Sequence, residues 1–210
     1  LDDNIRGLER STLEAGVTAD DAAETIQNLF VNVTDFTMMS QRQQEMLGET
    51  VAILDKLGVS AANSTKNIQF AIKALGMSTS QAESLQRELF TFAQELGVSA
   101  DQIAQDFQKF GSQIAALGTE GVGAFKELAA QAKSTGIAID DLIQITDQFN
   151  KFDTAAQAVG NLNALLGGPF LNTLRMVNET NPAKRMEMLK GALDDAAVSF
   201  DNMDFYQRKA

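Results

Sequence analysis

The chain contains no cysteine, histidine or tryptophan, and it has a single tyrosine, Tyr206. Without cysteine, the chain can form neither a disulfide framework nor a reactive thiolate. Without cysteine or histidine, a structural zinc site lacks its usual ligands, and the commonest general base of catalysis is missing. Acid–base chemistry would depend on carboxylates, lysines or Tyr206. We therefore expect a protein that is not an enzyme and that has no catalytic, metal or cofactor site.

Proline and positive charge are scarce as well. The two prolines are Pro169 and Pro182, and 17 basic residues stand against 28 acidic residues, which gives a net charge of −11. A protein that binds the phosphate backbone of nucleic acids is normally basic, so we expect no specific nucleic-acid binding. Hydrophobic residues make up 44% of the chain, which is enough for a packed core. The chain opens on Leu1 without a basic or apolar leader, and we expect a fragment of a longer protein or a processed product.

A short motif, Leu-Gly-Val/Met-Ser, recurs along the chain. Its copies are at residues 57–60, 75–78 and 96–99, with looser copies at 15–18 and 135–138. In each copy, the glycine can take the left-handed conformation that follows a helix C-terminus. The serine or threonine that ends every copy except 135–138 can cap the next helix. Ser78 with Gln81 and Ser99 with Gln102 also fit the capping box. The predicted corner residues are Gly58, Ser60, Gly76, Ser78, Gly97, Ser99 and Gly136.

Apolar residues between the corners follow helix periodicity. One such stripe is Ile103, Phe107, Phe110, Ile114 and Leu117, with steps of four and three residues. The corner glycines are 18 to 21 residues apart, except for a first interval of 42 that we expect to hold two helices with a break near residues 35–40. The sequence therefore predicts an all-α fold, a multi-helix bundle or a stack of short helices joined by tight Gly-Ser/Thr corners.

The helices divide by sequence into three segments. Residues 1–56 would form N-terminal helices, for which an extended arrangement stays open. Residues 57–153 would form a compact, repeat-like helical region. Residues 154–210 would form an uncharged helical hairpin and a C-terminal helix that continues into a longer protein.

The third segment opens with residues 154–174, which include no charged side chain. Asp153, just before this run, is expected to cap the helix that follows. Gly167-Gly168 is expected to end that helix, and Pro169 to take the first position of the next. Asn181-Pro182 is expected to begin another helix, which runs through Met186, Leu189 and Leu193 towards Phe200.

Some of these features admit a second interpretation. Acidic pairs such as Asp20-Asp21 and Asp140-Asp141 could bind calcium, but their place at expected helix N-termini favours a structural role. Gly118–Gly123 lacks the lysine and hydroxyl residue of a phosphate loop and indicates a corner.

Methionines, Met186 among them, could line an adaptable groove or fill the core. Polar residues and the Gly-Gly-Pro break argue against a simple membrane span in residues 154–174, whereas a hairpin buried between subunits, or one that inserts after a conformational change, stays open.

The stretch Gly136–Asn163 carries the most specific signal. It resembles the tail tape measure proteins of bacteriophages, especially those of contractile-tailed, T4-like and cyanophage type. The family pattern begins with Gly-Val/Ile-x-x-Asp/Glu-Asp/Glu-Leu, continues with Phe-x-x-Phe-Asp-x-Ala-Ala and ends with Leu-Asn. Its counterparts here are Gly136, Ile137, Asp140, Asp141, Leu142, Phe149, Phe152, Asp153, Ala155, Ala156, Leu162 and Asn163. The resemblance extends over residues 57–210 and is weaker before them.

The resemblance implies a structural role. Tape measure proteins lie in the tail tube in several copies, often three or six, and their length sets the length of the tail. They contact tail tube and baseplate hub proteins, leave ahead of the DNA on infection, and some act at the host membrane. We therefore expect a component of the virion tail, made in the host cytoplasm, that corresponds to a compact region near the baseplate. The residues expected to serve packing and assembly are Phe149, Phe152, Asp153, Leu162, Asn163, Gly167, Gly168 and Pro169.

Two alternatives from other classes stay open. A membrane-active protein would use residues 154–174 as an inserting hairpin that aids genome passage. A helical protein–protein adaptor would instead present an apolar groove to a partner.

Overall fold

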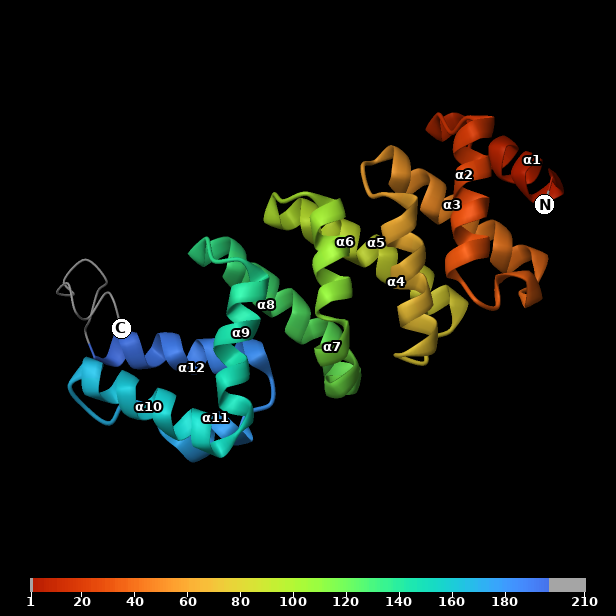
Figure 1. Ribbon diagram of the computed structural model, residues 1–210. Coiled ribbons are helices and arrows are strands. Elements are labelled where there is room, and N and C mark those ends of the chain that lie inside the picture. Colours follow the sequence, from red (N-terminus) through yellow and green to blue (C-terminus); the bar gives the residue numbers. More distant parts are fainter. Residues whose placement is uncertain (1, 197–210) are drawn as a thin grey trace. The chain divides into compact units, whose positions relative to one another are not determined.

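The computed structural model describes residues 2–196, and these form α-helices and short 3-10 helices without a β-strand (Figure 1). The predicted all-α, multi-helix fold is therefore confirmed. The chain divides into two compact units, Leu1–Gly121 and Val122–Ala210. The boundary lies within the stretch 57–153 that the sequence suggested as one segment, at the start of helix α8 (Gly121–Thr135).

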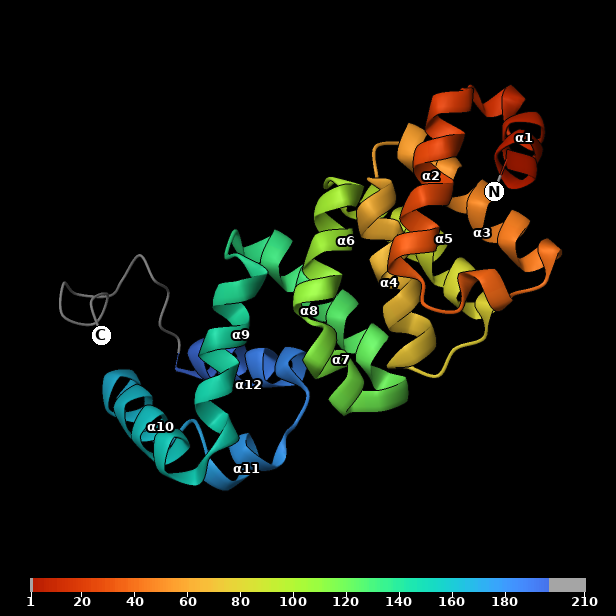
Figure 2. The same cartoon turned by 45° about the vertical axis from the view of Figure 1, so that its right-hand side comes forward.

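Unit 1 is built from helices that pack on their neighbours in sequence and on the next helix but one. Its α-helices are α1 (Asp2–Ser11), α2 (Ala19–Asn32), α3 (Gln41–Lys56), α4 (Ala61–Lys73), α5 (Thr79–Leu96), α6 (Ala100–Lys109) and α7 (Gly111–Leu117). Its 3-10 helices are η1 (Leu13–Ala15), η2 (Phe36–Met38) and η3 (Gly118–Glu120). Helix α4 lies against α2, α5 and α6, and α3 lies against α5 (Figure 2). Residues 2–56 are thus packed into the same unit as the helices that follow.

The tight corners form as the motif predicts. Gly58, Gly76, Gly97 and Gly136 all have positive φ angles, between 64° and 92°. Ser60, Ser78 and Ser99 each cap a helix by accepting a hydrogen bond from a backbone N–H. The expected break in the first long interval is present as well, since α2 ends at Asn32 and α3 begins at Gln41.

The two predicted capping boxes have different outcomes. At Ser78, the side chain accepts from the N–H of Gln81, and the Gln81 side chain accepts from the N–H of Ser78. At Ser99, the first bond forms, but the Gln102 side chain donates to Asp106 instead, at 2.9 Å. A nearby acceptor one helical turn later therefore competes for the side chain that the box requires.

Unit 2 contains helices α9 (Ile139–Asp147), α10 (Phe152–Leu166), α11 (Thr173–Asn178) and α12 (Pro182–Asp195), together with the 3-10 helix η4 (Gln148–Asn150) and nearly all of α8. Helix α9 crosses α12, as both ribbon views show, and α10 packs against η4 and α11 (Figure 1, Figure 2). One apolar cluster joins η4, α10, α11 and α12. Its buried members are Phe149, Ala155, Val159, Leu166, Leu171, Met176 and Ala192.

Two expectations about the ends of these helices are wrong. Asp153 does not cap α10, because the helix begins one residue earlier, at Phe152, after the extended residue Lys151. The exposed Asp153 lies in the first turn, where its charge still suits the helix dipole. Pro169 does not begin the next helix either, since α11 starts at Thr173 after the capping residue Asn172.

The remaining helix starts agree with the sequence. Asn181 caps α12, and Pro182 takes its first position. The helix then runs through Met186, Leu189 and Leu193 to Asp195, while Phe200 lies outside the described residues.

Candidate functional site

An apolar groove of about 410 Å³ opens in unit 2. It is bordered by α9, η4, α10 and α12, and the residue Leu171 after the turn that follows α10. The lining residues are Ile145, Gln148, Phe149, Ala158, Asn161, Leu162, Leu165, Leu166, Leu171, Met186, Leu189 and Leu193. All are apolar except Gln148 and Asn161, and none is charged. We call this feature the α10–α12 groove.

The groove has a buried floor and an accessible rim. Phe149, Leu166 and Leu171 form part of the floor and belong to the apolar core of unit 2. Leu162 is half-buried, and Leu193 retains 37% of its exposure. Apolar side chains that remain open to solvent in a concave surface favour contact with another apolar segment.

The uncharged run explains much of this surface. Helix α10 supplies five of the lining residues, between Ala158 and Leu166, all within the run 154–174. On the exposed side of the same helix, Gln157, Gly160 and Ala164 are also uncharged. A solvent-facing helix of this acidic chain would normally include charged residues along its length, whereas α10 has only Asp153 in its first turn. Beyond that turn, α10 has the composition of a helix that meets other protein surfaces.

A buried arginine holds the elements around the groove in place. Arg185, on α12, is 3% exposed. Its guanidinium donates to the carbonyl oxygens of Thr146 at 2.9 Å and Phe149 at 3.2 Å, and to Asn150 Oδ1 at 2.6 Å. These acceptors lie where α9 ends and η4 begins, so Arg185 satisfies carbonyls that the helix itself leaves without donors.

The same guanidinium also binds backbone carbonyls at the C-terminal end of α11. Its Nε donates to the carbonyl oxygens of Met176, at 3.1 Å, and of Glu179. Burial lowers the pKa of Arg185 below its ordinary value, while the nearby charges of Asp147 and Glu179 act in the opposite direction. Arginine stays protonated at neutral pH even so. The guanidinium of Arg185 is therefore hydrogen-bonded to three helical elements, α9, η4 and α11.

Sequence analysis did not identify Arg185, although a signal is present. Arg185 lies four residues before Leu189 and seven before Ala192, which places a charged side chain on the apolar stripe of α12. A charged residue in such a stripe is rarely buried unless its donors are satisfied.

The turn after α10 is fixed by an asparagine. The side chain of Asn163 binds the backbone of Leu171 in both directions, since Nδ2 donates to the carbonyl oxygen and Oδ1 accepts from the N–H, each at 2.8 Å. Gly167 ends the helix with a positive φ of 77°, and its N–H donates to the Asn163 carbonyl. Asn163 therefore directs the chain so that Leu171 returns to the groove.

The predicted assembly residues have separate places in this arrangement. Phe149 and Leu162 line the groove, and Asn163, Gly167 and Gly168 shape the turn beside it. Phe152, Asp153 and Pro169 are exposed and do not line it. Among the predicted corner residues, all except Gly136 belong to unit 1.

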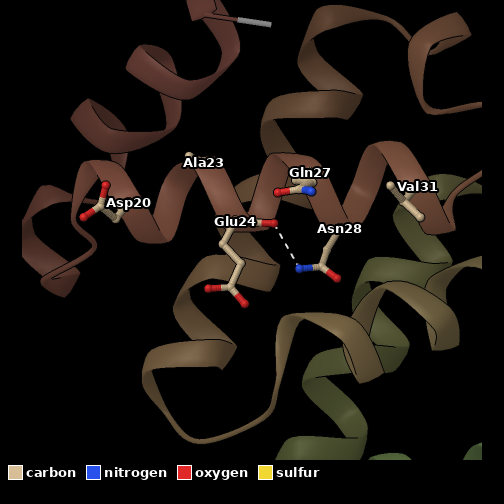
Figure 3. Close-up of a pocket in the computed structure, with 6 residues that line it drawn as sticks. All are labelled: Asp20, Ala23, Glu24, Gln27, Asn28 and Val31. Atoms are coloured by element: carbon tan, nitrogen blue, oxygen red, sulfur yellow. Dashed lines mark hydrogen bonds between the residues drawn. The ribbon is translucent and has the colours of Figure 1, made fainter.

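A second hollow, of about 560 Å³, lies along α2 (Figure 3). Its lining residues all come from that one helix: Asp20, Ala23, Glu24, Gln27, Asn28 and Val31. The only hydrogen bond drawn among them runs from Asn28 Nδ2 to the Glu24 carbonyl, at 3.0 Å. The hollow is thus the outer, polar side of a helix.

The acidic pairs lie where the structural interpretation places them. Asp20 and Asp21 lie in the first turn of α2, and Asp140 and Asp141 in the first turn of α9. Asp21 pairs with Lys56 at 2.5 Å, and hydrogen bonds from Lys56 and Thr18 hold the pKa of its carboxyl well below the ordinary range. Across the described part of the chain, no group of three or more acidic side chains is arranged to hold a metal ion.

The chain matches no protein-family model, no curated protein and no solved structure. Between residues 2 and 196, none of the helices is both long and apolar enough to cross a membrane.

Proposed function

We propose that the chain is a structural component of a phage tail, a part of the tape measure protein that sets tail length, occupies the tube and baseplate hub, and is released during genome ejection. The resemblance of Gly136–Asn163 to that family carries the proposal. One structural observation supports it: these residues include the consecutive helices α9 and η4 and most of α10, whose apolar side chains border the α10–α12 groove. The part of the chain with the family pattern is thus the part with a surface suited to assembly.

The partners in this proposal are further copies of the chain, three or six of them, together with tail tube and baseplate hub proteins. The net charge of −11 agrees with a place in the tube lumen, because an acidic protein does not bind the DNA that follows it. The tight corners favour a compact region of the longer protein, and we place it at the baseplate end.

The test follows the chain through infection. Peptides of the chain should be found by mass spectrometry in purified tailed particles, and they should leave the particles when DNA ejection is triggered. A major capsid protein serves as the control, because it stays with the emptied particle. Absence of the chain from the particles, or its full retention after ejection, would contradict the proposal.

The groove also favours a second candidate, a helical adaptor that binds one partner segment. The two candidates differ in self-association. An adaptor is a monomer in light scattering, whereas a tail component is expected to form oligomers of three or six copies.

The uncharged run 154–174 supports a third candidate, a membrane-active hairpin that aids genome passage. Such a protein would release dye from liposomes. The absence of release at any pH, with and without a membrane potential, would remove this candidate.

A further inference from the structure

The α10–α12 groove ends beside the point where the chain leaves α12. Leu193, the last of its α12 lining residues, is two residues before the end of that helix at Asp195. The structure describes the chain to Ala196, and residues 197–210 follow directly. Those fourteen residues are therefore attached at the rim of an open apolar surface.

The sequence of this segment suits that surface. It reads AVSFDNMDFYQRKA, so Phe200, Met203 and Phe205 are interleaved with polar residues rather than gathered in one run. Phenylalanine and methionine side chains are well matched to a concave surface of leucine, isoleucine and methionine. The groove offers no charged side chain that such residues would desolvate.

We propose that the α10–α12 groove binds residues 197–210 of the same chain, with Phe200, Met203 and Phe205 as the apolar contacts. This interaction is independent of the proposed function in a phage tail. The covalent link gives the segment an effective concentration in the millimolar range, so even a modest intrinsic affinity keeps the groove occupied.

The length of the segment is adequate. Four residues separate Ala196, the residue after α12, from Phe200, and nine separate it from Phe205, and an extended chain covers at most ~3.5 Å per residue. The reach is therefore about 14 Å for Phe200 and about 31 Å for Phe205, against a length of about 22 Å for α10, which has 15 residues at ~1.5 Å each. Phe200 can therefore reach the end of the groove beside Leu193, and Phe205 can reach along its length, without unwinding α12.

Tyr206 provides a specific probe of this interaction. It is the only tyrosine, and the chain has no tryptophan, so fluorescence excited in the tyrosine band comes from residue 206 alone. In the intact chain, Tyr206 should be protected from collisional quenching by acrylamide, relative to a synthetic peptide of residues 197–210. Equal quenching in chain and peptide would overturn the proposal.

Groove substitutions give the second test. Leu193→Asp and Asn161→Asp each place a charge in the lining at a position that is already exposed, so the fold should survive, as circular dichroism would verify. Both should raise the quenching of Tyr206 to the level of the free peptide. Leu174→Asp is the matched control, because Leu174 is 60% exposed and does not line the groove. It should leave the quenching unchanged.

The tail supplies the reciprocal variant. Phe200→Asp with Met203→Asp should abolish protection of Tyr206 without a change in the helical signal. Protection that persists in the groove variants, or that is lost equally in Leu174→Asp, would contradict binding in this groove. Protection that disappears on dilution, together with a doubled mass in light scattering, would show binding between two copies and would overturn the intrachain proposal.

Discussion

The amide side chain of Asn163 pairs with the backbone of Leu171 as one strand pairs with another, with one donated and one accepted hydrogen bond, both of 2.8 Å. Eight residues separate the two, and the Gly167-Gly168-Pro169 turn lies between them. The pairing replaces the backbone partners that Leu171 would have inside a helix or sheet. The chain stays outside a helix from Gly167 to Asn172, and α11 begins at Thr173.

We expect Asn163→Ala to destabilise the chain by about 1–3 kcal/mol, because it leaves the N–H and carbonyl of the buried Leu171 without partners. Urea unfolding followed by circular dichroism measures the change. Asn161→Ala is the control, since Asn161 is on the same helix but exposed. If Asn163→Ala lowers the free energy of unfolding as little as the control does, water replaces the hydrogen bonds of the Asn163 side chain to Leu171.

Arg185→Met should be among the most damaging single substitutions in unit 2. The methionine has similar length but no donors, so the carbonyls of Thr146, Phe149 and Met176 lose the guanidinium together. Each hydrogen bond to a charged group makes a net contribution of about 1.5–3 kcal/mol to stability, and we expect a total loss of at least about 3 kcal/mol. The free energy of unfolding in urea provides the measurement.

The neighbouring Lys184→Met is the matched control for this substitution. Lys184 is exposed and lies in the first turn of the same helix, so removing its charge tests the electrostatic effect alone. A similar loss in both variants would mean that the positive charge, and not the set of hydrogen bonds, stabilises unit 2.

Local chemistry determined what could be predicted from the sequence. A corner such as Gly97-Val98-Ser99 needs only a residue that tolerates positive φ and a hydroxyl that can cap, and both requirements lie within four residues. The start of α10 was predicted wrongly because the side chain of Asp153 has the oxygen that can cap a helix. The helix instead begins at Phe152, shortly after the 3-10 helix η4.

The candidate site depended on contacts that no local pattern describes. The uncharged composition of residues 154–174 indicated an unusual surface, but the groove exists only because Met186 and Leu189 of α12 are brought opposite α10. The burial of Arg185 likewise depends on carbonyls that are up to 39 residues away in sequence. Such features become predictable only when the pairing of the helices is known.

Acid should weaken the junction between α4 and α6 through Asp101. Its Oδ1 accepts from the N–H of Ser60 at 2.9 Å and from Asn63 Nδ2 at 2.8 Å, and its Oδ2 accepts from Gln105 Nε2 at 2.8 Å. Burial raises the pKa of Asp101, but the hydrogen bonds from Asn63, Ser60 and Gln105 outweigh it, so the pKa lies below its ordinary value of 3.8.

A folded-state pKa below the unfolded value means that ionised Asp101 stabilises the chain above pH 3.8 and that this contribution is lost as the pH falls towards the folded value. The stability difference between the chain and Asp101→Asn should therefore be constant near neutral pH and shrink below pH 3.8. Urea unfolding at a series of pH values measures it. Asp153→Asn, which changes an exposed carboxylate in the first turn of α10, serves as the control. A difference that does not depend on pH would contradict this role for Asp101.

Two glycines of α8 should respond in opposite ways to the same substitution. Gly121 is buried where the chain turns back on α7, and a Cβ atom there would lie 2.3 Å from the carbonyl oxygen of Ile114. Gly123, two residues later, has open space at the same position. The φ of −61° at Gly121 suits any residue, so the contrast between the two sites is steric and not conformational.

We therefore expect Gly121→Ala to destabilise the chain by about 1–3 kcal/mol, because the backbone of α7 has to move. Gly123→Ala should instead stabilise it by about 0.5–1 kcal/mol, since alanine loses less conformational freedom in a helix. Thermal and urea unfolding of the two variants, prepared side by side, measure both changes. If Gly121→Ala were also stabilising, the close approach of Gly121 to Ile114 would not exist in solution.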